Sequence, residues 1–217
     1  VKQPVVAVMI ENHVQARPQS GLAAASVVYE APVEANYTRF MALFPLNAAV
    51  AKAGPVRSAR PYFLDWLAEW PRPLYVHVGG SPDALELIEN RNVFDLNEIY
   101  RGWYFWRSAD RSAPHNAYTS SDLWQKAWSD YQGGSETAKA AWTFDEVNLC
   151  VSDCVTRVAV DWLPPAYAAE WRYSTSTGRY ERWQMEGQHK DLDGTPIMAD
   201  TVIVQRIQEK VVDAVGR

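Results

Sequence analysis

The segment 74–90 constrains the fold more than any other part of the chain, because it joins a buried strand to a capped helix. Leu74-Tyr75-Val76-His77-Val78 is an apolar run rich in strand-forming residues, and Gly79-Gly80 ends it. Ser81 is a favourable N-cap residue, and Pro82 is a favourable first residue for the helix that follows, to Asn90. A strand, a glycine turn and a capped helix in succession predict an α/β unit.

The residues before this unit predict further strands and one more helix. The continuous apolar run at 5–10 is typical of a strand buried on both faces. Segments 26–33 and 37–44 are also predicted strands, joined by a tight hairpin at Glu34-Ala35-Asn36. Apolar residues at helical spacing predict a helix over 61–70. The predicted fold is therefore α/β (α+β), with a mixed β-sheet flanked by helices.

The last third of the chain changes to strand-like alternation. Glycine-containing turns at Thr177-Gly178 and Asp193-Gly194 separate segments of alternating polar and apolar residues. We predict an α/β domain over 1–145 and a small antiparallel β unit over 146–217. The predicted strands of this unit are 155–162, 170–174, 178–184 and 202–207.

Composition and motif absences narrow the possible functions. The 217 residues are 47% hydrophobic and 22% charged, which is ordinary for a globular protein, and the net charge of -5 argues against a nucleic-acid partner. No apolar run reaches the ~18 residues of a membrane span. The glycine fingerprints of nucleotide sites are absent, so we expect no cofactor. His13, His77 and His115 are too scattered to predict a metal site.

Gly54-Pro55-Val56-Arg57-Ser58-Ala59-Arg60-Pro61 is the strongest candidate for a binding site. Arg57 and Arg60 lie where a helix is predicted to begin, although acidic residues are preferred at that end of a helix. A bound anion would compensate for this placement, and the guanidinium forks suit such a ligand. The alternative is internal pairing with Glu30, Glu34 or Asp65.

Other residues are predicted to orient the anion beside the two arginines. Gly79, Gly80 and Ser81 offer backbone N–H groups at a helix start, and Asn12-His13 follows the first strand. The polar loop Ser112-Ala113-Pro114-His115-Asn116 contributes Asn116. We expect Arg39 and Glu30 to hold the arginines in place. The expected ligand is an anionic small molecule, or a glycan or phosphate group.

Two alternative functions remain open, and the residues do not establish whether the chain is an enzyme. One is a hydrolase or transferase acting on phosphorylated or glycan material, with His77 or His115 as general acid or base. The other is a protein-interaction module that uses tryptophans on its surface. Its candidate residues are Trp103, Trp106, Trp124 and Trp128. Cys150 and Cys154 form either a short-loop disulfide or a pair of reduced thiols.

Several motifs together resemble one bacterial family. They are Ala7-Val8-Met9-Ile10-Glu11-Asn12, residues 16–22, Val28-Tyr29-Glu30, Thr38-Arg39-Phe40, Gly54 to Pro61, residues 77–81 and Ala113-Pro114-His115-Asn116. This set resembles the YerB-like lipoproteins, which are built from a domain of unknown function, and Tyr173 to Val204 is similar to the smaller second domain of that family.

The resemblance implies a location outside the cytoplasm, where the expected glycan or phosphate would belong to the cell envelope. A lipid anchor upstream of Val1 would be the only membrane contact, and the β unit would continue beyond Arg217. An oxidising location favours a Cys150–Cys154 disulfide. The family brings no catalytic residues to this sequence.

Overall fold

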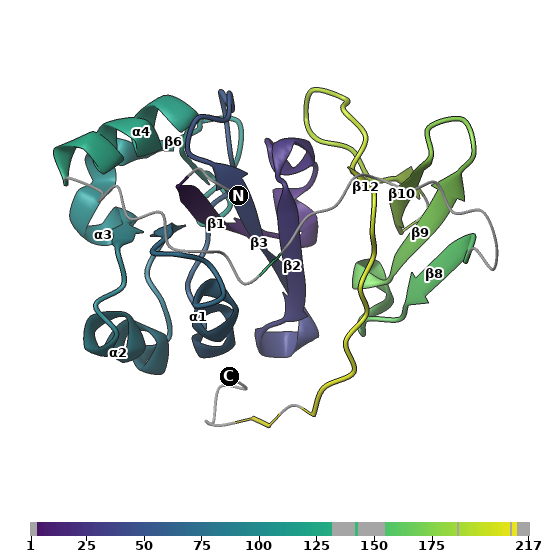
Figure 1. Ribbon diagram of the computed structural model, residues 1–217, viewed down its shortest axis with the longest axis horizontal. Helices are drawn as coiled ribbons and strands as arrows, with labels where there is room; N and C mark the ends of the chain where they lie inside the picture. Colours follow the sequence, from purple (N-terminus) through teal and green to yellow (C-terminus); the bar gives the residue numbers. More distant parts are fainter. Residues whose placement is uncertain (1–3, 132–141, 143–154, 186, 209, 212–217) are drawn as a thin grey trace.

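The computed structural model describes residues 4–131, 142, 155–185, 187–208 and 210–211. Two sheets lie side by side, and the helices are grouped around the N-terminal one (Figure 1). These helices are α1 (Pro61–Leu67), α2 (Pro82–Asn90), α3 (Glu98–Arg101) and α4 (Ser121–Asp130). The predicted boundary between residues 145 and 146 lies outside the described residues, as do Cys150 and Cys154.

The N-terminal sheet has five strands in the order β2-β3-β1-β4-β5. The strand β1 pairs with β3 in antiparallel register and with β4 in parallel register, so the sheet is mixed, as predicted. The strand β2 pairs antiparallel with β3, and β5 pairs parallel with β4. The strands are β1 (Val5–Glu11), β2 (Val27–Pro32), β3 (Thr38–Pro45), β4 (Leu74–His77) and β5 (Asp95–Asn97).

The central strand β1 is buried along its whole length because helices cover both faces of the sheet. Its even-numbered residues pack in one apolar cluster with Trp124 of α4 (Ser121–Asp130). Its odd-numbered residues pack on the other face, with Phe63 of α1 (Pro61–Leu67) and Ala84 of α2 (Pro82–Asn90). The continuous apolar run at the N-terminus is therefore explained by two-sided burial.

The two predicted helices differ in how well the sequence defines their ends. The helix α2 has the predicted bounds, and the Ser81 hydroxyl accepts a hydrogen bond from the N–H of Ala84. The helix α1 ends at Leu67, whereas the apolar spacing predicts a helix to Trp70. Residues 69 and 70 tighten into i→i+3 hydrogen bonds, which leaves Trp70 buried against the same core.

The chain between α2 and α4 forms β5 and several further short elements. It contains α3 (Glu98–Arg101) and a two-stranded ribbon of β6 (Trp106–Arg107) and β7 (Ala117–Tyr118). The loop between β6 and β7 carries His115 and Asn116. This ribbon is therefore what holds the candidate His-Asn pair.

The second sheet is antiparallel, as predicted. Its order is β11-β10-β9-β8, and β12 pairs with β10. The strands are β8 (Arg157–Val160), β9 (Ala169–Ser174), β10 (Arg179–Gln184), β11 (Gly187–Gln188) and β12 (Met198–Ala199).

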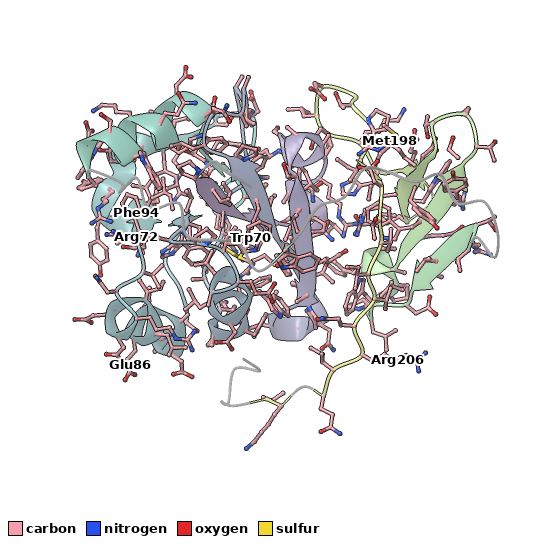
Figure 2. The ribbon with its side chains drawn as sticks, viewed as in Figure 1. Trp70, Arg72, Glu86, Phe94, Met198 and Arg206 are labelled. Carbon is pink, nitrogen blue, oxygen red and sulfur yellow. The ribbon has the colours of Figure 1, made fainter. Side chains whose placement is uncertain are left out.

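The strand predicted at 202–207 is wrong. Residues 201–208 form no strand, and Ile203 is 62% exposed. The backbone leaves the edge of β10 after Ala199, so the alternating side chains beyond it meet no neighbouring strand. Figure 2 shows Arg206 extending from this segment into open space.

A buried polar network joins the two sheets. Arg182 of β10 is 1% exposed, and its Nη2 donates to both carboxylate oxygens of Glu30 on β2, at 3.0 and 2.9 Å. Its Nη1 donates to Gln184 Oε1 at 2.8 Å and to His189 Nδ1 at 2.6 Å. His189 Nε2 in turn donates to Gln19 Oε1 at 2.7 Å. The edge strand β2 is thus the docking site of the second sheet (Figure 1).

Gly54 shapes the segment that leads to Arg57 and Arg60, and we expect Gly54→Ala to destabilise the protein. Its φ is +142°, and an added Cβ would lie 2.8 Å from the carbonyl oxygen of Ala117. Strain and steric overlap together predict a loss of about 1–3 kcal/mol in the free energy of unfolding, measured by urea titration. Gly102→Ala is the matched control, since nothing lies within 4 Å of its added Cβ. Equal stability of the two variants would contradict this explanation.

Candidate functional site

The segment carrying Arg57 and Arg60 is extended and precedes α1. The N–H of Arg57 donates to the carbonyl of Met9, and the N–H of Val78 donates to the carbonyl of Arg57. The segment therefore fills the space between the ends of β1 and β4. Arg60 is the N-cap residue of α1, without a capping side-chain bond, and α1 has only seven residues. Arg57, Ser58 and Arg60 are the residues of this segment that line the cleft described below.

A cleft of about 410 Å³ opens where β1 ends and β3 begins. Arg39, Arg57, Arg60 and His115 line it, so the structure brings together these four of the predicted site residues. The other ionisable or aromatic residues of its wall are Glu11, His13, Glu34 and Tyr37.

Arg57 and Arg60 are each paired with a carboxylate. Arg57 Nε lies 3.0 Å from Glu11 Oε1, but its N–H is not aimed at an acceptor, so this contact is ionic rather than a directed hydrogen bond. Arg60 makes a two-pronged contact with Glu34, at 2.5 Å from Nε and 2.7 Å from Nη2. Its Nη1 donates to the carbonyl of Ala59 at 2.6 Å.

Of the internal partners considered for these arginines, only Glu34 acts as one. Glu30 pairs with Arg182 and Asp65 pairs with Arg91, so neither holds Arg57 or Arg60. The partner of Arg57 is Glu11, which was not among the carboxylates predicted to pair with the arginines. Its position at the carboxyl end of the first predicted strand was the available signal.

Arg39 differs from the other two arginines. It lies opposite Glu11 in the β1–β3 register, is 6% exposed, and its Nη1 donates to the carbonyl of Ser58 at 2.7 Å. Within the described part of the chain no carboxylate forms an ion pair with it. Burial, followed by the charges of Arg60 and Arg57, lowers the pKa of Arg39 to about 10. A buried guanidinium without a counter-ion is costly, and here it faces the cleft.

Glu11 connects the arginines to the two histidines of the cleft. One carboxylate oxygen contacts Arg57, and the other lies 2.9 Å from His115 Nδ1. The His13 ring stacks on the His115 ring with centroids 4.7 Å apart. Burial, followed by the nearby charge of His115, lowers the pKa of His13. The carboxylate, one arginine and two imidazoles thus form one contiguous group.

The predicted residues Gly79, Gly80 and Ser81 have structural roles outside the cleft. The N–H of Gly79 donates to Asn97 Oδ1 at 2.9 Å, and its carbonyl accepts from the N–H of Ala59. Gly80 pairs with Ala59 in a parallel bridge, and Ser81 caps α2. These three residues therefore support the segment that carries the arginines.

The two predicted asparagines also have internal roles. Asn12 is fully buried, and its side chain bonds Thr38, Arg17 and Gln19. Asn116 accepts from Arg107 and donates to the carbonyl of Ser108, which closes the base of the His115 loop.

His77 is the candidate acid or base that the structure places in the core. Its ring is fully buried, with Nδ1 2.8 Å from the carbonyl of Gly79 and Nε2 3.3 Å from Asp95 Oδ2. Both ring nitrogens therefore have protein partners, and neither reaches the cleft.

The four tryptophans of the interaction hypothesis do not share one exposed surface. Trp124 is buried and stacks on Phe44, and Trp128 packs against Phe94. Of the four, Trp103 is the exposed member, at 63%. Two of the four side chains, Trp124 and Trp128, therefore belong to the core.

The described residues contain neither a membrane-spanning helix nor a metal-binding cluster. No helix among them has the length and apolar character needed to cross a bilayer. No cluster of three or more histidine, cysteine, aspartate or glutamate side chains among them is arranged for a metal ion.

Comparison with known proteins identifies the family. Residues 1–133 match the N-terminal domain, and residues 158–217 the C-terminal domain, of the "Protein of unknown function (DUF3048)" family. The chain belongs to this family, which confirms the resemblance seen in the motifs.

Two comparisons lead to the same relative in Bacillus subtilis (strain 168). The chain is 43% identical over 123 residues to "Putative lipoprotein YerB", a match that covers 56% of this chain and 37% of that protein. It is also similar to the crystal structure of the YerB protein from Bacillus subtilis, with a TM-score of 0.78, 32% identity, and coverage of 90% of this chain and 66% of that one. The chain thus spans less than two thirds of the relative it matches.

Proposed function

We propose that this protein is an extracytoplasmic lipoprotein that binds a small anion in the cleft between β1, β3 and the segment 53–60. The name of the Bacillus relative supports the lipoprotein part and a place at the cell envelope. The observation that supports anion binding is Arg39, whose buried guanidinium faces the cleft without an ion-pair partner among the described residues. A bound anion would supply that partner.

The charges of the cleft favour a ligand with a single negative charge. Three guanidinium groups face two carboxylates in its wall, which leaves one positive charge when the histidines are neutral. Each of the three guanidinium nitrogens of Arg60 contacts Glu34 or Ala59, so we treat Arg60 as a fixed wall. Apart from the bond of Arg39 Nη1 to Ser58, the donors of Arg39 and the terminal amino groups of Arg57 have no hydrogen-bond partner among the described residues. Two guanidinium edges suit the oxygen atoms of a tetrahedral phosphate group or a planar carboxylate group.

Loss of Arg39 is the direct test of this function. We expect Arg39→Met to weaken the binding of inorganic phosphate or acetate, measured by calorimetry, by roughly 10- to 100-fold, because one charge-assisted contact is lost. Arg57→Gln should weaken binding to a similar extent. Arg91→Met is the matched control, because Arg91 is paired with Asp65 on the surface. The proposal fails if the wild-type protein binds neither anion, or if all three variants lose affinity equally.

Removal of an internal competitor should have the opposite effect. Glu34→Gln leaves Arg60 without its carboxylate, so we expect phosphate to bind about 10-fold more tightly. Glu86→Gln, on the exposed surface of α2, changes the net charge by the same amount and should leave the affinity within about twofold. Equal effects of both substitutions would show that overall charge, and not the cleft, controls binding.

A further inference from the structure

The tautomer of His115 is set by its contact with Glu11. A carboxylate oxygen only accepts hydrogen bonds, so Nδ1 of His115, 2.9 Å away, is the nitrogen that carries the proton. In the neutral ring, Nε2 then holds the lone pair, and no described residue hydrogen-bonds it. His115 lines the cleft, so this lone pair belongs to a residue of the ligand-binding wall. A histidine oriented by a carboxylate, with its other nitrogen unoccupied, is the arrangement of a general base.

The carboxylate and the histidine are both held in place. The N–H of Glu11 donates to the carbonyl of Pro55, and its own carbonyl accepts from Gln19 Nε2. The loop that carries His115 is attached to the neighbouring loop by Arg111, which donates to the carbonyls of three residues there. Those residues are Gln15, Arg17 and Pro18, which lie two to five positions after His13 in the chain. Arg111 therefore fixes the distance between the two histidine-bearing loops.

His13 is oriented in the complementary way. The N–H of Gln15 donates to His13 Nδ1 at 3.2 Å, so Nδ1 is the acceptor and Nε2 carries the proton of the neutral ring. Its ring lies parallel to that of His115, with an angle of 11° between the planes. The stacked pair therefore presents one nitrogen that accepts a proton and one N–H that donates a hydrogen bond.

We propose that the cleft hydrolyses a phosphodiester, with His115 as the catalytic base. This inference rests on the proposed anion binding and extends it to a reaction. The geometry that supports it is the juxtaposition of the Glu11–His115 pair with His13, Arg39 and Arg57 in one cleft. A phosphodiester carries one negative charge at neutral pH, which matches the single excess positive charge of the wall.

The reaction needs only water as a second reactant. As the water oxygen forms its bond to phosphorus, one water proton passes to Nε2 of His115. The P–O bond to one ester oxygen breaks, and the protonated His115 returns that proton to the departing oxygen. The products are a phosphomonoester and an alcohol. Arg39 and Arg57 stabilise the charge that develops on the other phosphate oxygens, His13 donates a hydrogen bond, and Glu11 positions His115.

The experiment separates turnover from binding. We expect the wild-type protein to release p-nitrophenolate from bis(p-nitrophenyl) phosphate, and His115→Gln to lower kcat by at least about 100-fold with KM changed less than about threefold. Calorimetry with inorganic phosphate should show that the same variant still binds the anion, because Arg39 and Arg57 remain in the cleft. Glu11→Gln, which removes the charge that competes for Arg57, should lower both kcat and KM.

Each failure has a distinct meaning. A wild-type protein that binds phosphate but releases no p-nitrophenolate overturns the hydrolase inference and leaves the binding proposal standing. A protein that does neither overturns both. Activity that persists in His115→Gln, purified in the same way, would also overturn the assignment of the base, since contaminating or non-specific hydrolysis would then account for the signal.

Discussion

Replacing Glu30 with alanine is expected to lower the free energy of unfolding by about 3–5 kcal/mol, because it leaves a buried guanidinium without its counter-charge. Arg182 is almost completely buried, and Glu30 accepts two hydrogen bonds from its Nη2. Glu30 also accepts hydrogen bonds from Thr38 and Asn12, so its removal disturbs both sides of the contact between the sheets. The effect is measured by urea unfolding at neutral pH.

Glu170→Ala is the matched control for this substitution. Glu170 also makes a two-pronged contact with an arginine, Arg157, but that arginine is well exposed and the pair is on the surface. We expect little change in stability there, since solvent screens exposed ion pairs. If the two substitutions cost the same, burial of the Arg182–Glu30 pair would have no special role in joining the sheets.

Acidification below about pH 6 is expected to destabilise the protein through His189. Burial, followed by the charge of Arg182, lowers the pKa of His189 to about 2. The unfolded chain therefore takes up a proton below its ordinary pKa of about 6.5, while the folded protein does not. The contribution of His189 to stability is complete above that pH and declines by about 1.4 kcal/mol for each unit below it, until the folded group also titrates.

The comparison of wild type with His189→Gln isolates this effect from the carboxylates, which titrate in both proteins. We expect the variant to be less stable at pH 7, because His189 accepts from Arg182 and donates to Gln19. The stability difference should shrink by about 2–3 kcal/mol between pH 6.5 and pH 4.5, measured by urea unfolding at each pH. Parallel pH curves for the two proteins would contradict the assignment.

Much of the fold could be predicted because its signals are local. The Ser81 cap and the Pro82 start define α2 to the residue, and the turn at Glu34-Ala35-Asn36 joins β2 to β3 as predicted. These features depend on backbone sterics and on hydrogen bonds between near neighbours. The strand predicted at 202–207 shows the limit of such signals, since alternation alone does not supply a neighbouring strand.

The candidate site could be predicted only in part. Arg57 and Arg60 are recognisable from their spacing, and both line the cleft. The sequence pattern did not distinguish His115 from His77 as a candidate acid or base, because it does not show which of the two side chains is buried. Burial separates them, since the core encloses His77 while the β6–β7 loop carries His115 to Glu11.

The sequence by itself determined the order and type of most elements, and therefore the α+β class, because helix caps, turns and apolar periodicity act over a few residues. Only the tertiary structure decided the partners of the charges. Glu11 lies 104 residues from His115, and Glu30 lies 152 residues from Arg182. Which carboxylate meets which cation depends on how distant segments pack and on how far each pair is removed from water. That is why Arg39, expected to support its neighbours, is instead a buried arginine at the cleft without an ion-pair partner among the described residues.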